Sequence, residues 1–316
     1  MDLSPEIIFQ NYKNKEFDRV TSINYLISLI DNSNNEKIRL KSLKFLKKIN
    51  NFDNKLYDFI ENLFISDSSV KIRYEAAKII NKFYLSNSFT LLIWALNNES
   101  NTDCLAIIIK SLIDIDTIES KQALIREVEK IINIKQLKVG QMVSSNHFRK
   151  QIKDFLKKKK LSELSNEFLG QIIINYKTIL SIKNKFYSVY YELKNAKIIK
   201  LDLSDVEFEV RGWKAEFKNN IQSISEIPGL NNLKCLESLN LSNNLLSDIK
   251  GLEKLHNLSH LDFSNNKLDN IESLYILKVM PSLKHVKLNG NPVLLKKNFI
   301  EFVNGINFKL ETKSLI

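Results

Sequence analysis

The feature that most constrains this chain is a repeat of leucines and asparagines in its last third, with 22 residues from Leu236 to Leu258. Residues 236–257, 258–282 and 283–292 follow L-x-x-L-x-L-x-x-N, with an occasional Phe or Val in place of Leu, and the first two copies continue as x-L-x-x-I-x-x-L. The L-x-L part puts two apolar side chains on one face of a short strand. Because one coil cannot bury these side chains alone, we expect the coils to stack in parallel around a shared core.

An asparagine recurs where each coil should turn off its strand, at Asn244, Asn266 and Asn291. A side-chain amide in such a turn can bond the backbone of its own coil and of the neighbouring coil. We therefore expect the three asparagines to form a ladder with a structural role.

This pattern resembles the leucine-rich repeat in its short, 22-residue class, which occurs in a leucine-rich regulatory subunit of protein phosphatase type 1. The resemblance implies a small α/β solenoid with a parallel sheet whose concave face binds a protein. The positions that carry it are Leu236, Leu239, Leu241, Asn244, Leu246, Ile249, Leu252, Leu255, Leu258, Leu261, Phe263, Asn266, Leu268, Ile271, Leu274, Leu277, Leu283, Val286, Leu288 and Asn291.

An incomplete copy precedes these coils. Residues 198–208 match the strand part, with Val206 where asparagine is expected, and residues 224–233 match the second part. The role of the insertion between them, 209–223, stays open. Its Trp213 is either an anchor on the solenoid or an exposed hot spot for a partner.

Both ends of the array carry signals of their own. Residues 190–203 predict a strand, a turn at 194–196 and a second strand, which would cover the open edge of the sheet. Residues 288–310 resemble a leucine-rich-repeat cap, with a short helix that carries Phe299 and Phe302. An array needs such a cover because its last coil would otherwise expose apolar surface.

The first half contains a repeat of amphipathic helices. Residues 37–49 and 71–83 both begin with Lys-Ile-Arg and have apolar residues at helical spacing. Apolar stripes also predict helices over 53–65, 87–98 and 102–115, and the Asp and Ser residues between helices can cap the next helix. Such helices bury their stripes by stacking in pairs, which predicts an elongated solenoid.

This half resembles HEAT repeats over about residues 16–135, on the matching dipeptides Ile38-Arg39 and Ile72-Arg73. The resemblance implies protein binding along an extended surface and no catalysis. We therefore expect a HEAT-like domain at 1–165, a helical linker or cap at 166–189 and a leucine-rich-repeat domain at 190–316.

The formal charge of +11 is concentrated between the two arrays. Residues 141–200 hold 13 basic and 4 acidic side chains, whereas residues 1–140 hold 20 and 18 and residues 201–316 hold 14 and 14. A helix over 145–160 is expected to end in a lysine run. Its basic residues are Arg149, Lys150, Lys153, Lys157, Lys158, Lys159 and Lys160.

Two interpretations of this basic segment stay open. It could bind nucleic acid, an acidic membrane or an acidic protein through its charge. We favour the second interpretation, in which the lysines only solvate the outer face of the last helices and suit a helix C-terminus. The aromatic residues of 161–192 are expected to form the core that joins the two arrays rather than to stack on bases.

The candidate partner-binding residues lie between the leucines of the repeat, where side chains should face outward on the concave sheet. They are Lys200, Asp202, Ser238, Asn240, Ser242, Asn243, His260, Asp262, Ser264, Asn265, His285, Lys287 and Asn289. His260 and His285 should be neighbours with Asp262 close by. A metal site is conceivable there, but we favour a bare polar surface, because metal ligands usually need supporting residues.

No catalytic motif, nucleotide-binding loop or cofactor motif is recognisable, so we expect neither enzyme activity nor a bound cofactor. The two cysteines, Cys104 and Cys235, fit a reducing cytosol, and the first residues do not resemble a signal peptide. We expect a soluble, cytoplasmic interaction protein acting as a scaffold or adaptor. By family analogy alone the partner could be a phosphatase or a small GTPase, and nucleic acid or an acidic membrane is the alternative ligand.

Overall fold

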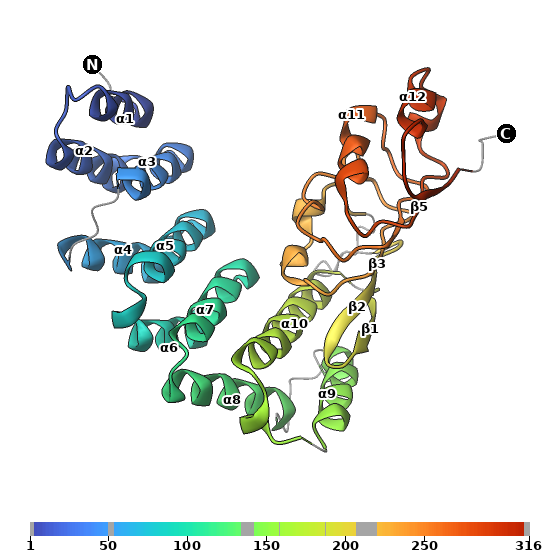
Figure 1. The fold of residues 1–316 in the computed structure, drawn as a ribbon, viewed down its shortest axis with the longest axis horizontal. Helices are drawn as coiled ribbons and strands as arrows, with labels where there is room; N and C mark the ends of the chain where they lie inside the picture. Colours follow the sequence, from blue (N-terminus) through green and yellow to red (C-terminus); the bar gives the residue numbers. More distant parts are fainter. Residues whose placement is uncertain are drawn as a thin grey trace, which may run out of the picture. The chain divides into compact units, whose positions relative to one another are not determined.

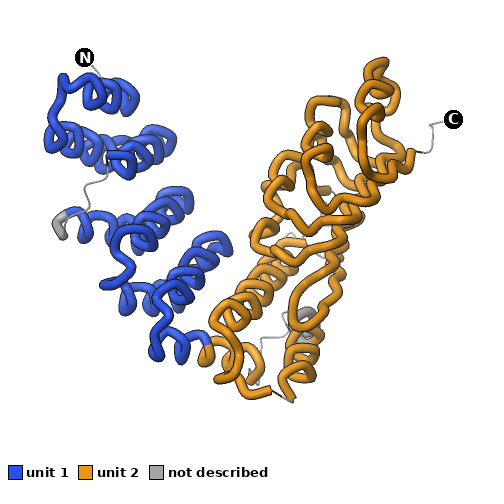
Figure 2. Tube along the Cα trace, viewed as in Figure 1, with its two compact units in different colours: residues 1–124 blue, residues 125–316 orange. Residues whose placement is uncertain are grey.

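The computed structural model describes residues 3–49, 54–133, 142–157, 159–186, 188–206 and 220–312. The chain divides into two compact units, residues 1–124 and 125–316 (Figure 2). The first unit is helical, and the second contains a mostly parallel sheet, so the expected fold class is confirmed: a helical solenoid followed by a small leucine-rich-repeat solenoid (Figure 1). Within the described ranges, no helix has the length and apolar character needed to cross a bilayer.

Helices of the first unit pack in pairs, α2 on α3, α4 on α5 and α6 on α7, and the second helices of the pairs stack in a row (Figure 1). The bounds are α1 Pro5–Lys13, α2 Arg19–Asn32, α3 Glu36–Ile49, α4 Asn54–Ser66, α5 Val70–Phe83, α6 Phe89–Asn98, α7 Thr102–Ile115 and α8 Ile118–Asn133, the last of which crosses into the second unit.

The sequence pattern accounts for these helices. The apolar stripe of α5 is buried at Ile72, Ala76 and Ile79. The side chain of Ser69 caps α5, and that of Asn101 caps α7 by accepting hydrogen bonds from two backbone amides. The predicted helices are therefore confirmed, with shifts of at most two residues at their ends, and so is a serine cap at Ser69; the cap at Asn101 was not predicted.

Arg39 and Arg73 give the recurring Lys-Ile-Arg its physical role. Arg73 donates from Nε to Glu99 Oε2 at 2.9 Å and from Nη1 to the carbonyl of Asp67 at 2.8 Å. Arg39 donates from Nε to the carbonyl of Ile30 at 2.9 Å and pairs with Asp67. Each arginine thus ties its own helix pair to the acidic residue that precedes the second helix of the next pair.

The second unit contains α9 and α10 followed by a six-stranded sheet in the order β1-β2-β3-β4-β5-β6. β1 pairs antiparallel with β2, and all later pairs are parallel. The bounds are α9 Met142–Leu156, α10 Asn166–Lys185, β1 Tyr190–Lys194, β2 Lys197–Asp202, β3 Ser238–Asn240, β4 His260–Asp262, α11 Ile271–Leu274, β5 His285–Lys287, α12 Phe299–Val303 and β6 Lys309–Glu311.

The predicted asparagine ladder is confirmed. Asn266 Nδ2 donates to the carbonyls of Leu241 in the preceding coil, at 2.9 Å, and of Phe263 in its own coil, at 3.0 Å. Its Oδ1 accepts the amide of Leu246 at 2.9 Å. Asn244 and Asn291 make the same set of bonds, and all three are buried. Each asparagine therefore supplies buried backbone groups of two coils with the hydrogen-bond partners that they would otherwise lack.

The register of the first coil differs from the sequence expectation. The amide of Ile221 donates to Asn244 Oδ1 at 2.9 Å, as the amide of Leu246 does to Asn266. Ile221, rather than Ile224, therefore takes the place of Leu246. The expected alignment of 224–233 was wrong by three residues because I-x-x-I-x-x-L matches itself at that shift. Residues 207–219, with Trp213, lie outside the described residues.

The N-terminal edge of the array is covered as predicted. β1 and β2 form an antiparallel pair, and Asn195 and Ala196 at its turn have φ of 51° and 63°. Positive φ at both central residues matches the twist of a tight hairpin. α10 packs on β2, where Asn175 Nδ2 donates to the carbonyl of Ala196 at 3.4 Å.

The basic segment is arranged differently from the expectation. α9 ends at Leu156, so the lysine run follows the helix instead of forming its last turn. Tyr176 and Phe186 from the following aromatic segment are buried in the second unit. Of the lysine run, Lys158 lies outside the described residues.

Candidate partner-binding face

The strand register brings the predicted face residues into two rows, which run across the sheet. Each strand contributes one residue to row one and one to row two. In β2–β6 the row-two residue follows the row-one residue by two positions in the sequence, and in the antiparallel β1 it precedes it by two. Row one consists of Glu192, Lys200, Ser238, His260, His285 and Lys309. Row two consists of Tyr190, Asp202, Asn240, Asp262, Lys287 and Glu311.

Four members of these rows were missing from the sequence expectation. Tyr190 and Glu192 come from β1, and Lys309 and Glu311 come from β6. Tyr190 is the most notable addition, because its side chain is an aromatic group with a relative exposure of 74%. The predicted strand–turn–strand could not have revealed the two β1 residues, because the pairing of β1 with β2 shifts by one residue between Glu192 and Leu193, which changes the residues that face the same way.

Row two also supports the backbone. Asp262 Oδ1 accepts the amide of Ser264 at 2.9 Å, and Asn240 Oδ1 accepts the amide of Ser242 at 3.0 Å. Asn240 Nδ2 in turn donates to Asp202 Oδ2 at 3.1 Å. A substitution in row two therefore changes the stability of the turn as well as the surface, whereas row one is the cleaner place to test binding.

Charges on the face are mixed and partly paired. Lys200 Nζ lies 3.0 Å from Glu192 Oε2, and Lys287 Nζ lies 3.9 Å from both Asp262 Oδ2 and Glu311 Oε2. These groups are partly exposed, so the pairs contribute little to folding stability. They give the face alternating positive and negative positions, which suits a partner with a complementary pattern.

The two histidines of row one are neighbours, with ring centroids 6.1 Å apart and planes at 79°. His260 Nδ1 lies 2.9 Å from the hydroxyl of Ser259, and His285 Nε2 lies 3.3 Å from Glu311 Oε2 without hydrogen-bond alignment. Across the described part of the chain, no three His, Cys, Asp or Glu side chains gather closely enough to hold a metal ion. The geometry here offers a polar contact surface with two neighbouring imidazole rings.

The remaining predicted face residues lie where the chain leaves the strands. Asn243 and Asn265 are exposed, and Asn265 Nδ2 donates to Asn243 Oδ1 at 2.8 Å. Ser264 and Asn289 are half-buried. Ser242 is only 9% exposed, so it has little side-chain surface to offer a partner, contrary to its place among the candidates.

The basic residues of the middle segment are spread over different contacts. Arg149 Nε donates to the carbonyl of Ile131 at 2.9 Å, and Lys157 Nζ lies 2.6 Å from Asp154 Oδ1. Lys160 Nζ lies 3.8 Å from Glu163 Oε1, while Lys150 and Lys153 are exposed on α9. These basic residues are therefore spread over a helix and the turn that follows it. They do not form a concentrated basic patch.

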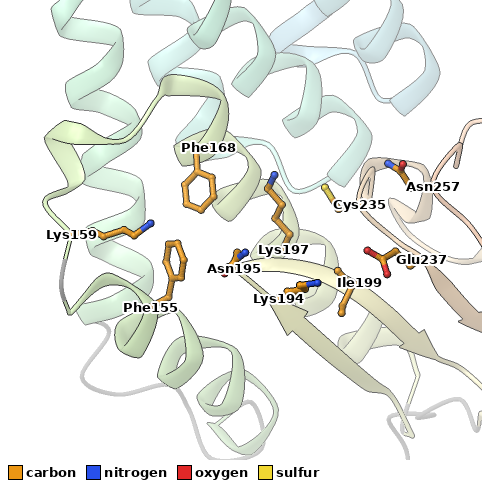
Figure 3. A pocket seen from close by; sticks show the side chains of 10 residues that line it. All are labelled: Phe155, Lys159, Phe168, Lys194, Asn195, Lys197, Ile199, Cys235, Glu237 and Asn257. Atoms are coloured by element: carbon orange, nitrogen blue, oxygen red, sulfur yellow. The ribbon is translucent and has the colours of Figure 1, made fainter.

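Lys159 contributes to a groove of about 540 Å³ at the start of the sheet (Figure 3). Its Nζ lies 4.4 Å from the centre of the Phe155 ring, which stacks on Phe168 at 5.6 Å. The groove is lined by Phe155, Lys159, Phe168, Lys194, Asn195, Lys197, Ile199, Cys235, Glu237 and Asn257. Its polar, open lining adds a possible contact area for a partner. The lining residues do not form a recognisable catalytic arrangement.

Comparison with known proteins agrees with the coil geometry. The family model described as Leucine Rich repeats (2 copies) matches residues 236–276, which include β3 and β4. No curated protein matches the chain. The matched residues and the parallel sheet together support a leucine-rich-repeat domain that follows a helical unit.

Proposed function

We propose that this chain is a non-enzymatic scaffold or adaptor that binds a folded protein through rows one and two. The observation that carries the proposal is the continuous, polar surface of two rows over six strands, with the exposed Tyr190 at one end. Tyrosine is common among residues that dominate binding energy at protein interfaces, because it combines a large apolar ring with a hydroxyl. Leucine-rich repeats elsewhere bind proteins, which agrees with this use of the sheet.

The finer features of the architecture belong to the same proposal. The helical unit is of the HEAT type, and its support is the equivalent bonding of Arg39 and Arg73. Residues 288–310 act as the C-terminal cap, since Phe302 of α12 is buried and β6 extends the sheet. The cytoplasm is the proposed location, supported by two cysteines that are both free thiols.

A phosphatase and a small GTPase are the first partner classes to test, on family resemblance. Nucleic acid or an acidic membrane bound through residues 145–160 has less support, because Lys157 and Lys160 lie beside carboxylates of their own segment. Binding by that segment would fall steeply between low and moderate salt, whereas binding by the mixed-charge rows would change little.

The test compares two variants that both make the net charge more negative, by three charges in the row variant and by four in the control, so the control carries the larger change. Lys200→Glu/His260→Glu/Tyr190→Ala alters row one and the exposed tyrosine, without touching the backbone bonds of row two. Lys254→Glu/Lys297→Glu changes two exposed lysines outside the rows. Captured partners are compared by mass spectrometry, and the dissociation constant is then measured with the purified partner.

We expect the row variant to weaken binding by about 100-fold or more, since loss of one aromatic contact that dominates binding energy costs about 2 kcal/mol or more, and two row-one side chains also change charge. The lysine control should bind within about threefold of the wild type. Equal binding by the row variant and the wild type would refute the proposed face, provided that both have the same circular dichroism spectrum.

A further inference from the structure

A lysine-lined groove of about 690 Å³ lies on the helical unit, between α3 and α5, and shares no residue with rows one and two. It is lined by Lys41, Lys44, Phe45, Lys47, Lys48, Glu75, Lys78 and Lys82. Six lysines thus surround a single carboxylate, although residues 1–140 as a whole are close to neutral. We call this feature the lysine groove.

The carboxylate is already used inside the lysine groove. Glu75 is buried, and its two oxygens each lie 3.0 Å from an ammonium group, that of Lys47 and that of Lys78. Lys41 pairs with Glu6. Among the described residues no ion-pair partner is found for Lys44, Lys48 or Lys82, and all three are exposed.

The placement of these lysines follows the helix repeat. Lys44 and Lys78 are 34 residues apart, as are Lys48 and Lys82, so the same two positions carry lysine in consecutive helix pairs. The next helix of the stack, α7, does not extend this set of lysines without an ion pair, because Lys110 Nζ lies 2.9 Å from Asp114 Oδ2. A lysine-rich composition explains how many lysines the chain has, but it does not explain why unpaired ones gather here, where they repel each other.

We propose that the lysine groove binds an acidic α-helical segment of a protein partner, at a site separate from rows one and two. Lys41, Lys44 and Lys48 lie on one face of α3 and span about 10 Å along its axis. A helix with carboxylates on one face repeats them every turn, about 5.4 Å, which matches this spacing. The methylene stems of the lysines and the ring of Phe45 provide an apolar floor for the rest of such a helix.

The lining argues against nucleic acid as the occupant. Phe45 stacks on Phe9, with centroids 4.5 Å apart and planes at 10°, and Lys48 Nζ lies 5.2 Å from the Phe45 centroid. That ring is therefore already stacked and is a poor platform for a base. The lining contains no Arg, Asn or Gln, so it lacks the side chains that form planar, two-bond contacts with base edges.

The experiment uses the full chain and fluorescence anisotropy with four labelled or competing probes. The first is an amphipathic peptide of about 18 residues with glutamates on one helical face and leucine and alanine elsewhere. The second has the same composition in an order that spreads the glutamates around the helix. The third is a single-stranded DNA oligonucleotide, and the fourth is a vesicle that contains phosphatidylserine.

Two variants with the same loss of charge are compared. Lys44→Gln/Lys48→Gln/Lys82→Gln removes the unpaired lysines of the groove, and Lys254→Gln/Lys284→Gln/Lys297→Gln removes three exposed lysines from the other unit. None of these six lysines forms an ion pair with a described residue, so both variants should fold. Circular dichroism and thermal unfolding check that they do.

We expect the amphipathic peptide to bind the wild type and the control variant equally within about twofold, and to bind the groove variant at least about tenfold more weakly. Failure of the amphipathic peptide to bind, or an equal loss in both variants, would overturn the proposal. So would equal binding of the rearranged peptide, or tighter groove-dependent binding of the oligonucleotide or vesicle. None of these outcomes bears on rows one and two, so the two proposals fail separately.

Discussion

A β-carbon added to Gly290 would lie 2.2 Å from the side-chain oxygen of Asn265 in the preceding coil. Gly290 also has φ of +68°, in a row with Asn243 and Asn265, which both have φ of 56°. This row turns each coil off its strand in a left-handed conformation that asparagine tolerates and glycine adopts freely. The Asn265–Asn243 hydrogen bond holds the Asn265 side chain, so a β-carbon at position 290 could be accommodated only by displacing that side chain from its bond.

Gly290→Ala should therefore lower the free energy of unfolding by about 2–3 kcal/mol, from backbone strain and displacement of Asn265 together. Gly305→Ala is the matched control, because Gly305 has φ of +85° but nothing within 4 Å of an added β-carbon. It should cost only about 1 kcal/mol. Urea unfolding measures both, and an equal cost at the two glycines would show that crowding at Gly290 is unimportant.

Asn266→Ala should destabilise the second unit by about 3 kcal/mol or more. The change leaves buried backbone groups of two coils without a partner, and each such group costs about 1–3 kcal/mol. Asn257→Ala is the control, since Asn257 is exposed and its Nδ2 donates to the carbonyl of Lys234 at 2.6 Å. Loss of this bond should lower the free energy of unfolding, measured in urea, by less than about 1 kcal/mol. If the two variants lost similar amounts, the asparagine ladder would not have the stabilising role proposed for it.

Glu99 should make the stability of the helical unit depend on acid. Burial opposes its charged form, but hydrogen bonds from Arg73 and from the amides of Asn101 and Ser100 outweigh this and hold the pKa of Glu99 below its ordinary value of 4.5. With a folded pKa below the unfolded one, its contribution is complete above about pH 4.5 and disappears as the pH falls through the folded pKa.

Glu99→Gln should accordingly cost about 1–3 kcal/mol at pH 7, because Arg73 loses its charged partner. The difference from the wild type should shrink as the pH falls below 4.5. Glu119→Gln, at an exposed position on α8, serves as the control and should change stability little at either pH. A Glu99→Gln cost that is the same at pH 7 and at low pH would contradict this account.

The sequence was informative where the physical signal is periodic. Asn244, Asn266 and Asn291 were placed in a ladder because their spacing and their turn position were both visible. Lys44 and Lys78 were missed as a cluster for the opposite reason. They lie on different helices. The net charge of residues 1–140 is close to zero, because the same stretch contains acidic residues that lie outside the groove. Only the stacking of α3 against α5 brings them into one groove.

The two edges of the face were missed for a different reason. Tyr190 and Glu192 carry no repeat pattern, and they join the rows only through the antiparallel register of β1. Ser242 was included because its position in the repeat suggested exposure, yet it is only 9% exposed. Periodicity thus predicts which way a strand residue points, but not what neighbouring turns leave accessible.

The two cysteines should react very differently with iodoacetamide. Burial, with the nearby Glu99 charge, raises the pKa of Cys104 to about 12, and its side chain is fully buried. Since the thiolate is the reactive form, Cys104 should stay unmodified at pH 8. Cys235 is partly exposed and lines the groove of Figure 3, so it should be alkylated in the native protein.

Mass spectrometry should then show one alkyl group on the native chain and two after unfolding in urea. A Cys235→Ser variant should show none while folded, and alkylation of its Cys104 in the native state would mean that the α5–α7 packing opens far more readily than its buried contacts indicate.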